Sequence, residues 1–162
     1  MGLFDAFSKK KEATIASPVK GRLVDVTEVS DETFSTEILG TTVAVIPEEG
    51  RFYAPASGKI VTLFPTLHAL AIETPEGVEV LLHIGLDTVK LNGKYFVAHC
   101  AEGDTIKQGQ LLMEVNLDAV KSEGYDVITP IVICNTADMK AVNKEPAGNV
   151  APGDPVMKVA VN

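Results

Sequence analysis

The stretch of sequence that decides the fold is a pair of short apolar runs on either side of a turn. Residues 68–83 read HALAIETPEGVEVLLH, and their centre is Thr74-Pro75-Glu76-Gly77. Proline in the second position and glycine in the fourth are typical of a type I turn. Alternating apolar runs of this length are typical of strands, so the segment predicts an antiparallel β-hairpin.

The hairpin brings two of the chain's three histidines to its open end. If Thr74 pairs with Gly77, His68 lies directly opposite His83 on one face, with Cβ atoms about 5 Å apart. A G1 bulge in the same turn would shift the register by one residue and put the two rings on opposite faces. The spacing therefore permits a pair of facing imidazoles and leaves the register open.

The remainder of the chain has the composition of a β-protein. Val and Ile together number 30 against 13 Leu, and Gly and Pro recur between short apolar runs. This pattern predicts an all-β fold, an antiparallel β-sandwich or barrel-sandwich hybrid with short helical turns. The predicted strands are Lys20–Val26, Val43–Ile46, Lys59–Phe64, Ala69–Thr74, Val78–Ile84, Leu111–Val115, Ile128–Cys134 and Pro155–Val161. A short helix is predicted at Leu117–Ser122, with Asn116 as its cap.

Two weak internal repeats suggest that the sandwich is duplicated. Residues 17–24 resemble residues 54–61, and residues 102–106 resemble residues 152–156. If these repeats are real, two similar half-barrels pack together. Gly-Asp turns are common in proteins, however, so the second likeness has a simpler reading as two unrelated turns.

The length of 162 residues fits one domain, predicted at residues 14–162, after an N-terminal segment at residues 1–13. Residues 1–11 combine apolar side chains at helical spacing with three lysines. We expect either a short amphipathic helix that makes weak contact with an anionic membrane surface, or a disordered tail. The residues concerned are Met1, Leu3, Phe4, Phe7, Lys9, Lys10 and Lys11.

Charge and composition exclude several classes of protein. A net charge of −8 argues against nucleic-acid binding, because few cations are available to neutralise phosphates. No apolar run reaches the roughly 18 residues of a membrane-spanning helix, and no secretory signal is expected. Cys100 and Cys134 lack the spacing of a disulfide framework or a CxxC motif. We therefore expect a cytoplasmic protein, with peripheral contact at the inner membrane face as an option.

A pair of imidazoles on an apolar face has three interpretations. The rings can be structural, each hydrogen-bonded in the core. They can ligate zinc, although only Asp87 is evident as a further ligand. They can carry out phosphoryl transfer, with one ring as nucleophile and the other stabilising the phosphoryl oxygens.

Two segments around these histidines resemble the signature segments of a known family. Residues 64–69 (FPTLHA) and 82–89 (LHIGLDTV) are similar to those of the glucose-type enzyme IIA components of the bacterial phosphoenolpyruvate-dependent sugar phosphotransferase system. The likeness extends over nearly all of residues 15–160. The sequence departs from the family pattern at four positions, Thr41 and Thr42 in place of an Asp-Gly pair, and Leu70 and Leu81 where Phe is common.

The resemblance implies a role for each residue at the hairpin end. It implies that His83 carries the phosphoryl group on Nε2 and that His68 donates a hydrogen bond to the phosphoryl oxygens. Thr66 is implied to orient His68 through Nδ1, and the carbonyl of Gly85 to accept from Nδ1 of His83. A ring held at Nδ1 presents its Nε2 lone pair, as a nucleophile requires.

The resemblance also implies partners. The phosphoryl group would come from the histidine-containing phosphocarrier protein and pass to a sugar-specific enzyme IIB, with regulatory protein targets as further candidates. No cofactor is required, and zinc at His68 and His83 of the unphosphorylated protein is an option. For each candidate residue of the docking rim, simple core packing is at least as good a reading. The candidates are Phe34, Ile38, Leu39, Phe64, Leu70, Leu81, Asp87 and Val89.

Two other classes of protein remain as alternatives. A lipoyl or biotinyl carrier module has similar half-barrel patterns, and Asp138-Met139-Lys140 faintly resembles its modified lysine. The residues flanking Lys140 do not form a symmetrical hairpin, however. A lysostaphin-like zinc peptidase would use His83 and Asp87, but the chain lacks the HxH motif that such a site also needs.

Overall fold

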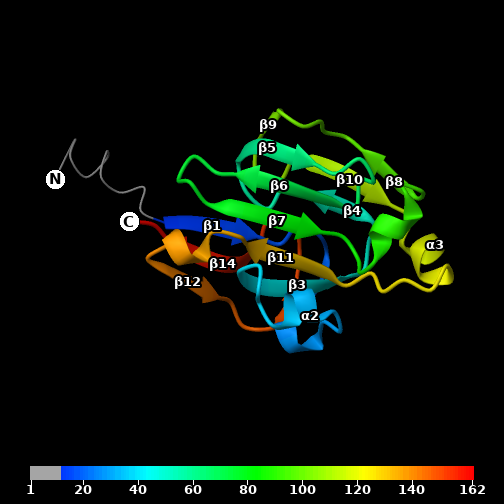
Figure 1. The fold of residues 1–162 in the computed structure, drawn as a ribbon, viewed down its shortest axis with the longest axis horizontal. Coiled ribbons are helices and arrows are strands. Elements are labelled where there is room, and N and C mark those ends of the chain that lie inside the picture. Colours follow the sequence, from blue (N-terminus) through cyan, green and yellow to red (C-terminus); the bar gives the residue numbers. More distant parts are fainter. Residues whose placement is uncertain (1–11) are drawn as a thin grey trace.

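The structure, a computed structural model, describes residues 12–162 and consists mainly of short antiparallel strands (Figure 1). The strands are β1 (Glu12–Ala16), β2 (Gly21–Val24), β3 (Thr41–Pro47), β4 (Arg51–Tyr53), β5 (Gly58–Leu63), β6 (Ala69–Glu73), β7 (Glu79–His83), β8 (Phe96–Ala98), β9 (Thr105–Ile106), β10 (Leu111–Val115), β11 (Thr129–Ile133), β12 (Ala141–Lys144), β13 (Gly148–Val150) and β14 (Pro155–Ala160). The helices are η1 (Val26–Glu28), α2 (Glu32–Ser35), η2 (Thr88–Leu91), α3 (Leu117–Ser122) and η3 (Thr136–Asp138).

The strands form three sheets whose order reveals a duplication. Two three-stranded sheets have the orders β1-β14-β12 and β4-β10-β8, and the eight-stranded sheet has the order β13-β2-β3-β11-β7-β6-β5-β9. Each half of the large sheet and one small sheet therefore form a unit with the same connections. One unit, β4 to β10, is inserted between β3 and β11 of the other. The predicted duplicated sandwich is confirmed (Figure 1).

The first predicted repeat is confirmed and the second is wrong. Ser17 and Ala54 occupy equivalent places, because each exchanges two backbone hydrogen bonds with a turn: Ser17 with residues 153–154, and Ala54 with residues 109–110. The counterpart of residues 153–154 is thus residues 109–110. Residues 103–104 pair with Ile60 instead. The sequence likeness followed the shared shape of a Gly-Asp turn and not its place in the fold.

Every predicted strand is present within a few residues of its expected ends. Lys20–Val26 is shortened, because the carboxylate of Asp25 accepts the backbone N–H of Thr27 and starts η1. The helix Leu117–Ser122 has the predicted bounds, and Oδ1 of Asn116 accepts from the backbone N–H of Ala119 at 3.1 Å. The pattern missed the short strands β1, β4, β8, β9, β12 and β13 and the four-residue helix α2.

Two apolar clusters hold the sheets together. The larger lies inside the sandwich, where alternate residues of each strand point inward, as Val43 and Val45 of β3 do. The smaller lies on the outer face of the large sheet, where Phe34 of α2 packs over Val132 of β11. Strand β11 is consequently buried on both faces. Helix α2 also reaches the last residue of β7, His83, whose ring contacts Phe34.

Glu12 and Ala13, which the predicted boundary assigns to the N-terminal segment, pair with Ala160 and Val159 of β14. The amphipathic segment predicted at residues 1–11 lies outside the described residues. In the part of the chain that the structure describes, no helix is long and apolar enough to cross a membrane.

Candidate functional site

The hairpin that carries the histidines has the bulged register. The backbone N–H of Gly77 donates to the carbonyl of Thr74, which closes the predicted turn, but Thr74 pairs with Val78 through the Val78 carbonyl. The positive φ of Gly77, 89°, provides the extra residue of the bulge. His83 therefore pairs with Ala69, so the hairpin has the second of the two registers that the sequence left open, and His68 does not pair directly with His83.

The two rings meet in spite of this register. His68 lies opposite Ile84, whose N–H donates to the His68 carbonyl at 2.7 Å. The chain bends at Leu67, where φ is 63°, and His68 precedes the first residue of β6. Its side chain is thus free of the strand's alternation. The ring centroids of His68 and His83 lie 4.9 Å apart with the ring planes nearly perpendicular.

Each ring is held at Nδ1 by a residue two positions away. Nδ1 of His83 lies 2.7 Å from the carbonyl oxygen of Gly85. A carbonyl can only accept, so this nitrogen carries the proton and Nε2 of the neutral ring bears the lone pair. Nδ1 of His68 lies 2.7 Å from Oγ1 of Thr66. When that hydroxyl donates, the proton of His68 sits on Nε2, which is then a hydrogen-bond donor.

Burial keeps both rings neutral near pH 7. His68 is only 4% exposed. Burial, together with the positive charge that His83 would carry, lowers the pKa of His68 to about 4. Burial also lowers the pKa of His83, against the opposing effects of the Gly85 carbonyl and the carboxylates of Asp31 and Asp87. The site thus combines an unprotonated Nε2 with a neutral N–H donor.

Two aromatic rings enclose the histidines. Phe34 of α2 packs against His83 with ring centroids 4.8 Å apart, and Phe64 contacts His68 edge-on at 5.4 Å. Phe34 is buried, whereas Phe64 remains partly exposed. The apolar walls account for the desolvation that lowers the pKa of each histidine.

The structure divides the predicted docking rim into three groups. Ile38, Leu39, Phe64, Val89 and Asp87 are exposed, and Leu81 is half-buried. Phe34 is buried but forms a wall of the site. Leu70 is 1% exposed and belongs to the main core. Its assignment to the rim is wrong, because Leu70 shares the inward face of β6 with Ile72.

Sequence reasoning missed Asp31, whose carboxylate raises the pKa of His83. Asp31 precedes α2 and its Oδ1 accepts the backbone N–H of Thr33 at 2.9 Å. An aspartate three residues before a buried Phe is a typical helix start, so this signal was present in the sequence.

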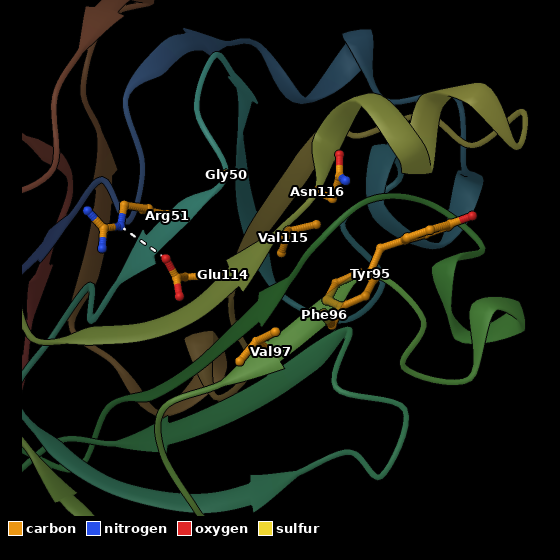
Figure 2. A pocket seen from close by; sticks show the side chains of 8 residues that line it. All are labelled: Gly50, Arg51, Tyr95, Phe96, Val97, Glu114, Val115 and Asn116. Atoms are coloured by element: carbon orange, nitrogen blue, oxygen red, sulfur yellow. Dashed lines mark ion pairs between the residues drawn. The ribbon is translucent and has the colours of Figure 1, made fainter.

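The other candidate features do not converge on the histidines. A surface groove of about 570 Å³ between β4, β8 and β10 has polar groups that already have partners (Figure 2). There, Glu114 pairs with Arg51 at 3.3 Å and with His99 at 2.7 Å. Lys140 is not at a hairpin tip; its backbone N–H donates to Ala160 of β14. Within residues 12–162, no group of three or more His, Cys, Asp or Glu is arranged to hold a metal ion.

The chain is similar to several known proteins. It is 38% identical to the glucose-specific EIIA component of Bacillus anthracis, over 98% of this chain and 97% of that protein. The match to the β-glucoside-specific EIIBCA component of Dickeya chrysanthemi is 39% over 92% of this chain. That alignment spans 24% of the longer protein, so the chain corresponds to about a quarter of such relatives. The structure of glucose permease IIA from Mycoplasma capricolum superposes with a TM-score of 0.87 and 37% identity, covering 98% of this chain and 99% of the other.

Fold and site together define a duplicated β-sandwich domain with two neutral imidazoles at the end of one hairpin, each oriented through Nδ1. Residues 13–139 match the family described as phosphoenolpyruvate-dependent sugar phosphotransferase system, EIIA 1. The chain belongs to this enzyme IIA family. Carrier modules with a modified lysine and zinc peptidases find no support in these comparisons.

Proposed function

We propose that this protein is a phosphocarrier of the sugar phosphotransferase system that accepts a phosphoryl group on Nε2 of His83. The observation that carries the proposal is the hydrogen bond from Nδ1 of His83 to the Gly85 carbonyl, which leaves the Nε2 lone pair free. In the transfer, this lone pair forms an N–P bond to phosphorus. The N–P bond of the donor phosphohistidine breaks, and its electron pair stays with the donor ring. No net proton or electron transfer is needed.

The role of His68 follows from its neutral state and its partner. With the Thr66 hydroxyl donating to Nδ1, Nε2–H of His68 donates to a phosphoryl oxygen on His83. A phosphoryl group carries close to two negative charges near neutral pH. These charges raise the proton affinity of His68, so the ring becomes a stronger donor once His83 is phosphorylated. The oxygens of the phosphoryl group are therefore stabilised during transfer by the His68 N–H, which is already in position.

The surroundings of the site favour protein partners. Ile38, Leu39, Phe64 and Val89 expose apolar side chains on segments that flank the histidines. The carboxylates of Asp31 and Asp87 act on His83 electrostatically. A partner with an apolar patch and nearby cationic side chains would complement this face. We propose the histidine-containing phosphocarrier protein as the donor and a sugar-specific enzyme IIB as the acceptor. The EIIBCA name of the Dickeya chrysanthemi relative supports the second assignment.

The experiment is phosphorylation with phosphoenolpyruvate and the general phosphotransferase proteins, followed by mapping of the modified residue. The wild-type protein should gain one acid-labile phosphoryl group on His83. His83→Gln should gain none. His68→Gln should still accept the group, because an amide can donate a hydrogen bond, but its transfer to enzyme IIB should slow about 100-fold or more.

His99→Gln is the matched control, because His99 lies on the surface and pairs with Glu114. It should accept and transfer at the wild-type rate. Phosphorylation of His83→Gln would contradict the assignment of the nucleophile. If His68→Gln alone fails to accept, the two histidines have the opposite roles.

We also propose that the unphosphorylated pair forms half of a zinc site. Nε2 of His83 bears a lone pair because Nδ1 donates to the Gly85 carbonyl. Nε2 of His68 bears one in the other tautomer, in which Nδ1–H donates to the Thr66 hydroxyl oxygen. Two imidazoles leave two positions of a tetrahedral zinc ion for ligands from a partner protein. Calorimetric titration with zinc should detect weak binding to the wild-type protein and none after phosphorylation. Equal binding by His83→Gln would contradict the assignment.

A further inference from the structure

The turn after β7 holds the Gly85 carbonyl in a tight place. Gly85 has a φ of 79°, a conformation that glycine adopts without strain. A Cβ atom at this position would lie 2.6 Å from Cγ2 of Thr88 and 2.9 Å from the backbone oxygen of Asp126. The backbone N–H of Leu86 donates to that same oxygen at 2.9 Å. Gly85 is thus packed between the side chain of Thr88 and the chain at Asp126.

Thr88 makes two contacts with this turn. Its side chain is fully buried, and its hydroxyl donates to the carbonyl of Ile84 at 2.5 Å. Its methyl group lies against the backbone of Gly85. The amide of Ile84 donates to the carbonyl of His68 at 2.7 Å. Ile84 is therefore bonded on one side to the segment of one histidine and on the other to Thr88.

We propose that Thr88 is a positioning residue for phosphoryl transfer, which holds the peptides of Ile84 and Gly85 so that the Gly85 carbonyl stays directed at Nδ1 of His83. The proposal rests on the phosphocarrier function and goes beyond it. Thr88 acts through Gly85 and does not itself touch the reacting atoms.

The physical argument is that a glycine leaves the two peptides on either side of it free to turn. The Leu86 N–H on the Asp126 oxygen anchors the second peptide, which carries the Gly85 carbonyl, but among the residues that the structure describes only Thr88 anchors the first. Gly85 has two backbone torsions with wide allowed ranges. The hydroxyl of Thr88 fixes the carbonyl that precedes Gly85, and the methyl group restricts Gly85 itself. If the carbonyl turned away, Nδ1–H of His83 would lose its acceptor. The proton could then move to Nε2, where it blocks the lone pair that attacks phosphorus.

The test uses Thr88→Val, which keeps the shape and removes the hydroxyl, and Thr88→Ser, which keeps the hydroxyl. Thr74→Val is the matched control: Thr74 is also buried, and its hydroxyl accepts the backbone N–H of Val78 at 3.1 Å, at the opposite end of the same hairpin. Two quantities are measured. Nitrogen NMR of unphosphorylated protein reports the tautomer of His83, and single-turnover kinetics report its phosphorylation rate.

Wild-type His83 should be in the Nδ1–H tautomer. Thr88→Val should shift it toward a mixture of tautomers and slow phosphorylation about tenfold, the usual scale for losing an outer-shell partner. Thr88→Ser, which keeps the hydroxyl and loses only the methyl group, should keep more of the Nδ1–H tautomer than Thr88→Val, and Thr74→Val should change neither quantity. An unchanged tautomer in Thr88→Val would overturn the proposal. So would the same change in Thr74→Val, because a general loss of stability would then explain it.

The NMR measurement needs no phosphoryl donor, so the two proposals can fail separately. If wild-type protein accepts no phosphoryl group while Thr88→Val still changes the tautomer, the phosphocarrier function fails and the positioning by Thr88 stands. If wild-type His83 carries its proton on Nε2, the positioning by Thr88 fails irrespective of phosphorylation.

Discussion

At the residue scale, a different hydrogen bond at Nδ1 gives the two buried histidines, His68 and His83, different tautomers. His83 meets a carbonyl, which can only accept, whereas His68 meets a hydroxyl, which can also donate. The first ring therefore presents a lone pair and the second presents a proton. The apolar wall formed by Phe34 and Phe64 keeps both rings uncharged until a phosphoryl group arrives.

The low pKa of His68 predicts a pH dependence of stability. In the unfolded chain His68 has a pKa near 6.5, and in the fold about 4, so the unfolded state binds more protons in between. The stabilising effect of a neutral His68 is complete above pH 6.5 and is lost as the pH falls to about 4. By about pH 5 the loss amounts to about 2 kcal/mol of unfolding free energy.

Urea unfolding of wild-type protein and His68→Gln, at about pH 7 and about pH 5, measures this contribution. The comparison cancels the groups that the two proteins share, so the difference reports His68 together with its electrostatic coupling to His83. The wild-type protein should lose about 2 kcal/mol more than His68→Gln over this range. Equal losses would show that His68 is not desolvated in the fold.

At the scale of the element, the four-residue helix α2 links charge and shape at the site. So short a helix is not stable by itself, and α2 depends on the Asp31 cap and on the burial of Phe34. It therefore brings a carboxylate and an aromatic ring to His83 together. The hairpin also depends on two local features that act together. The bulge at Gly77 shifts the register by one residue, and the bend at Leu67 still brings the two rings into contact.

Asp31→Asn tests the electrostatic part of this element. Asparagine caps helices as well as aspartate does, so α2 should remain folded. The carboxylate raises the pKa of His83, and its removal should lower that pKa further. Asp25→Asn is the control, because Asp25 caps η1 in the same way and has no such effect on His83. Titration of His83 by NMR would contradict the prediction if both variants shifted its pKa alike.

At the scale of the whole molecule, a difference between the two duplicated units explains why the site lies in only one half. The pairing of Ala69 with His83 in one unit corresponds to that of Thr42 with Val132 in the other. Val132 is buried under helix α2, and α2 belongs to the segment that joins β2 to β3. The equivalent connection of the second unit, from β5 to β6, is a short turn that contains Thr66. One half of the outer face is therefore covered and the other is open at His83.

Substitutions of Leu70 in the core and of Ile38 on the rim should have opposite effects on stability and on binding of the donor. Leu70→Ala should lower the unfolding free energy by about 2–5 kcal/mol, because it leaves a cavity in the main core. The mutant protein that remains folded should transfer the phosphoryl group normally.

Ile38→Asp should change stability by less than about 0.5 kcal/mol, because Ile38 is 77% exposed. It should raise the KM for the donor about tenfold, through lost apolar contact.

Urea unfolding and donor-dependent transfer rates measure both effects. A wild-type KM in Ile38→Asp would remove Ile38 from the docking surface. A raised KM in folded Leu70→Ala would restore Leu70 to the rim, in conflict with its position on the inward face of β6.

The sequence by itself determined whatever depends on neighbours along the chain. Alternation of Val, Ile and Thr specified eight strands, and Asn116 marked the start of α3. The spacing of His68 and His83 brought two imidazoles to one hairpin end, and the resemblance of the flanking segments assigned them a function. Such features are local, since a turn and two strand patterns suffice to define a hairpin.

Only the tertiary structure decided what depends on contacts distant in sequence. Of the two hairpin registers that the sequence allowed, the structure has the bulged one, and a local bend at Leu67 still lets the rings meet. Leu70 belongs to the core and not to the rim, because packing against the opposite sheet decides which face of β6 is buried. Residues 109–110, not 103–104, proved equivalent to 153–154, because equivalence follows from pairing with Ala54 and Ser17. The cover of α2 over Val132 likewise arises from packing, which a local pattern does not encode.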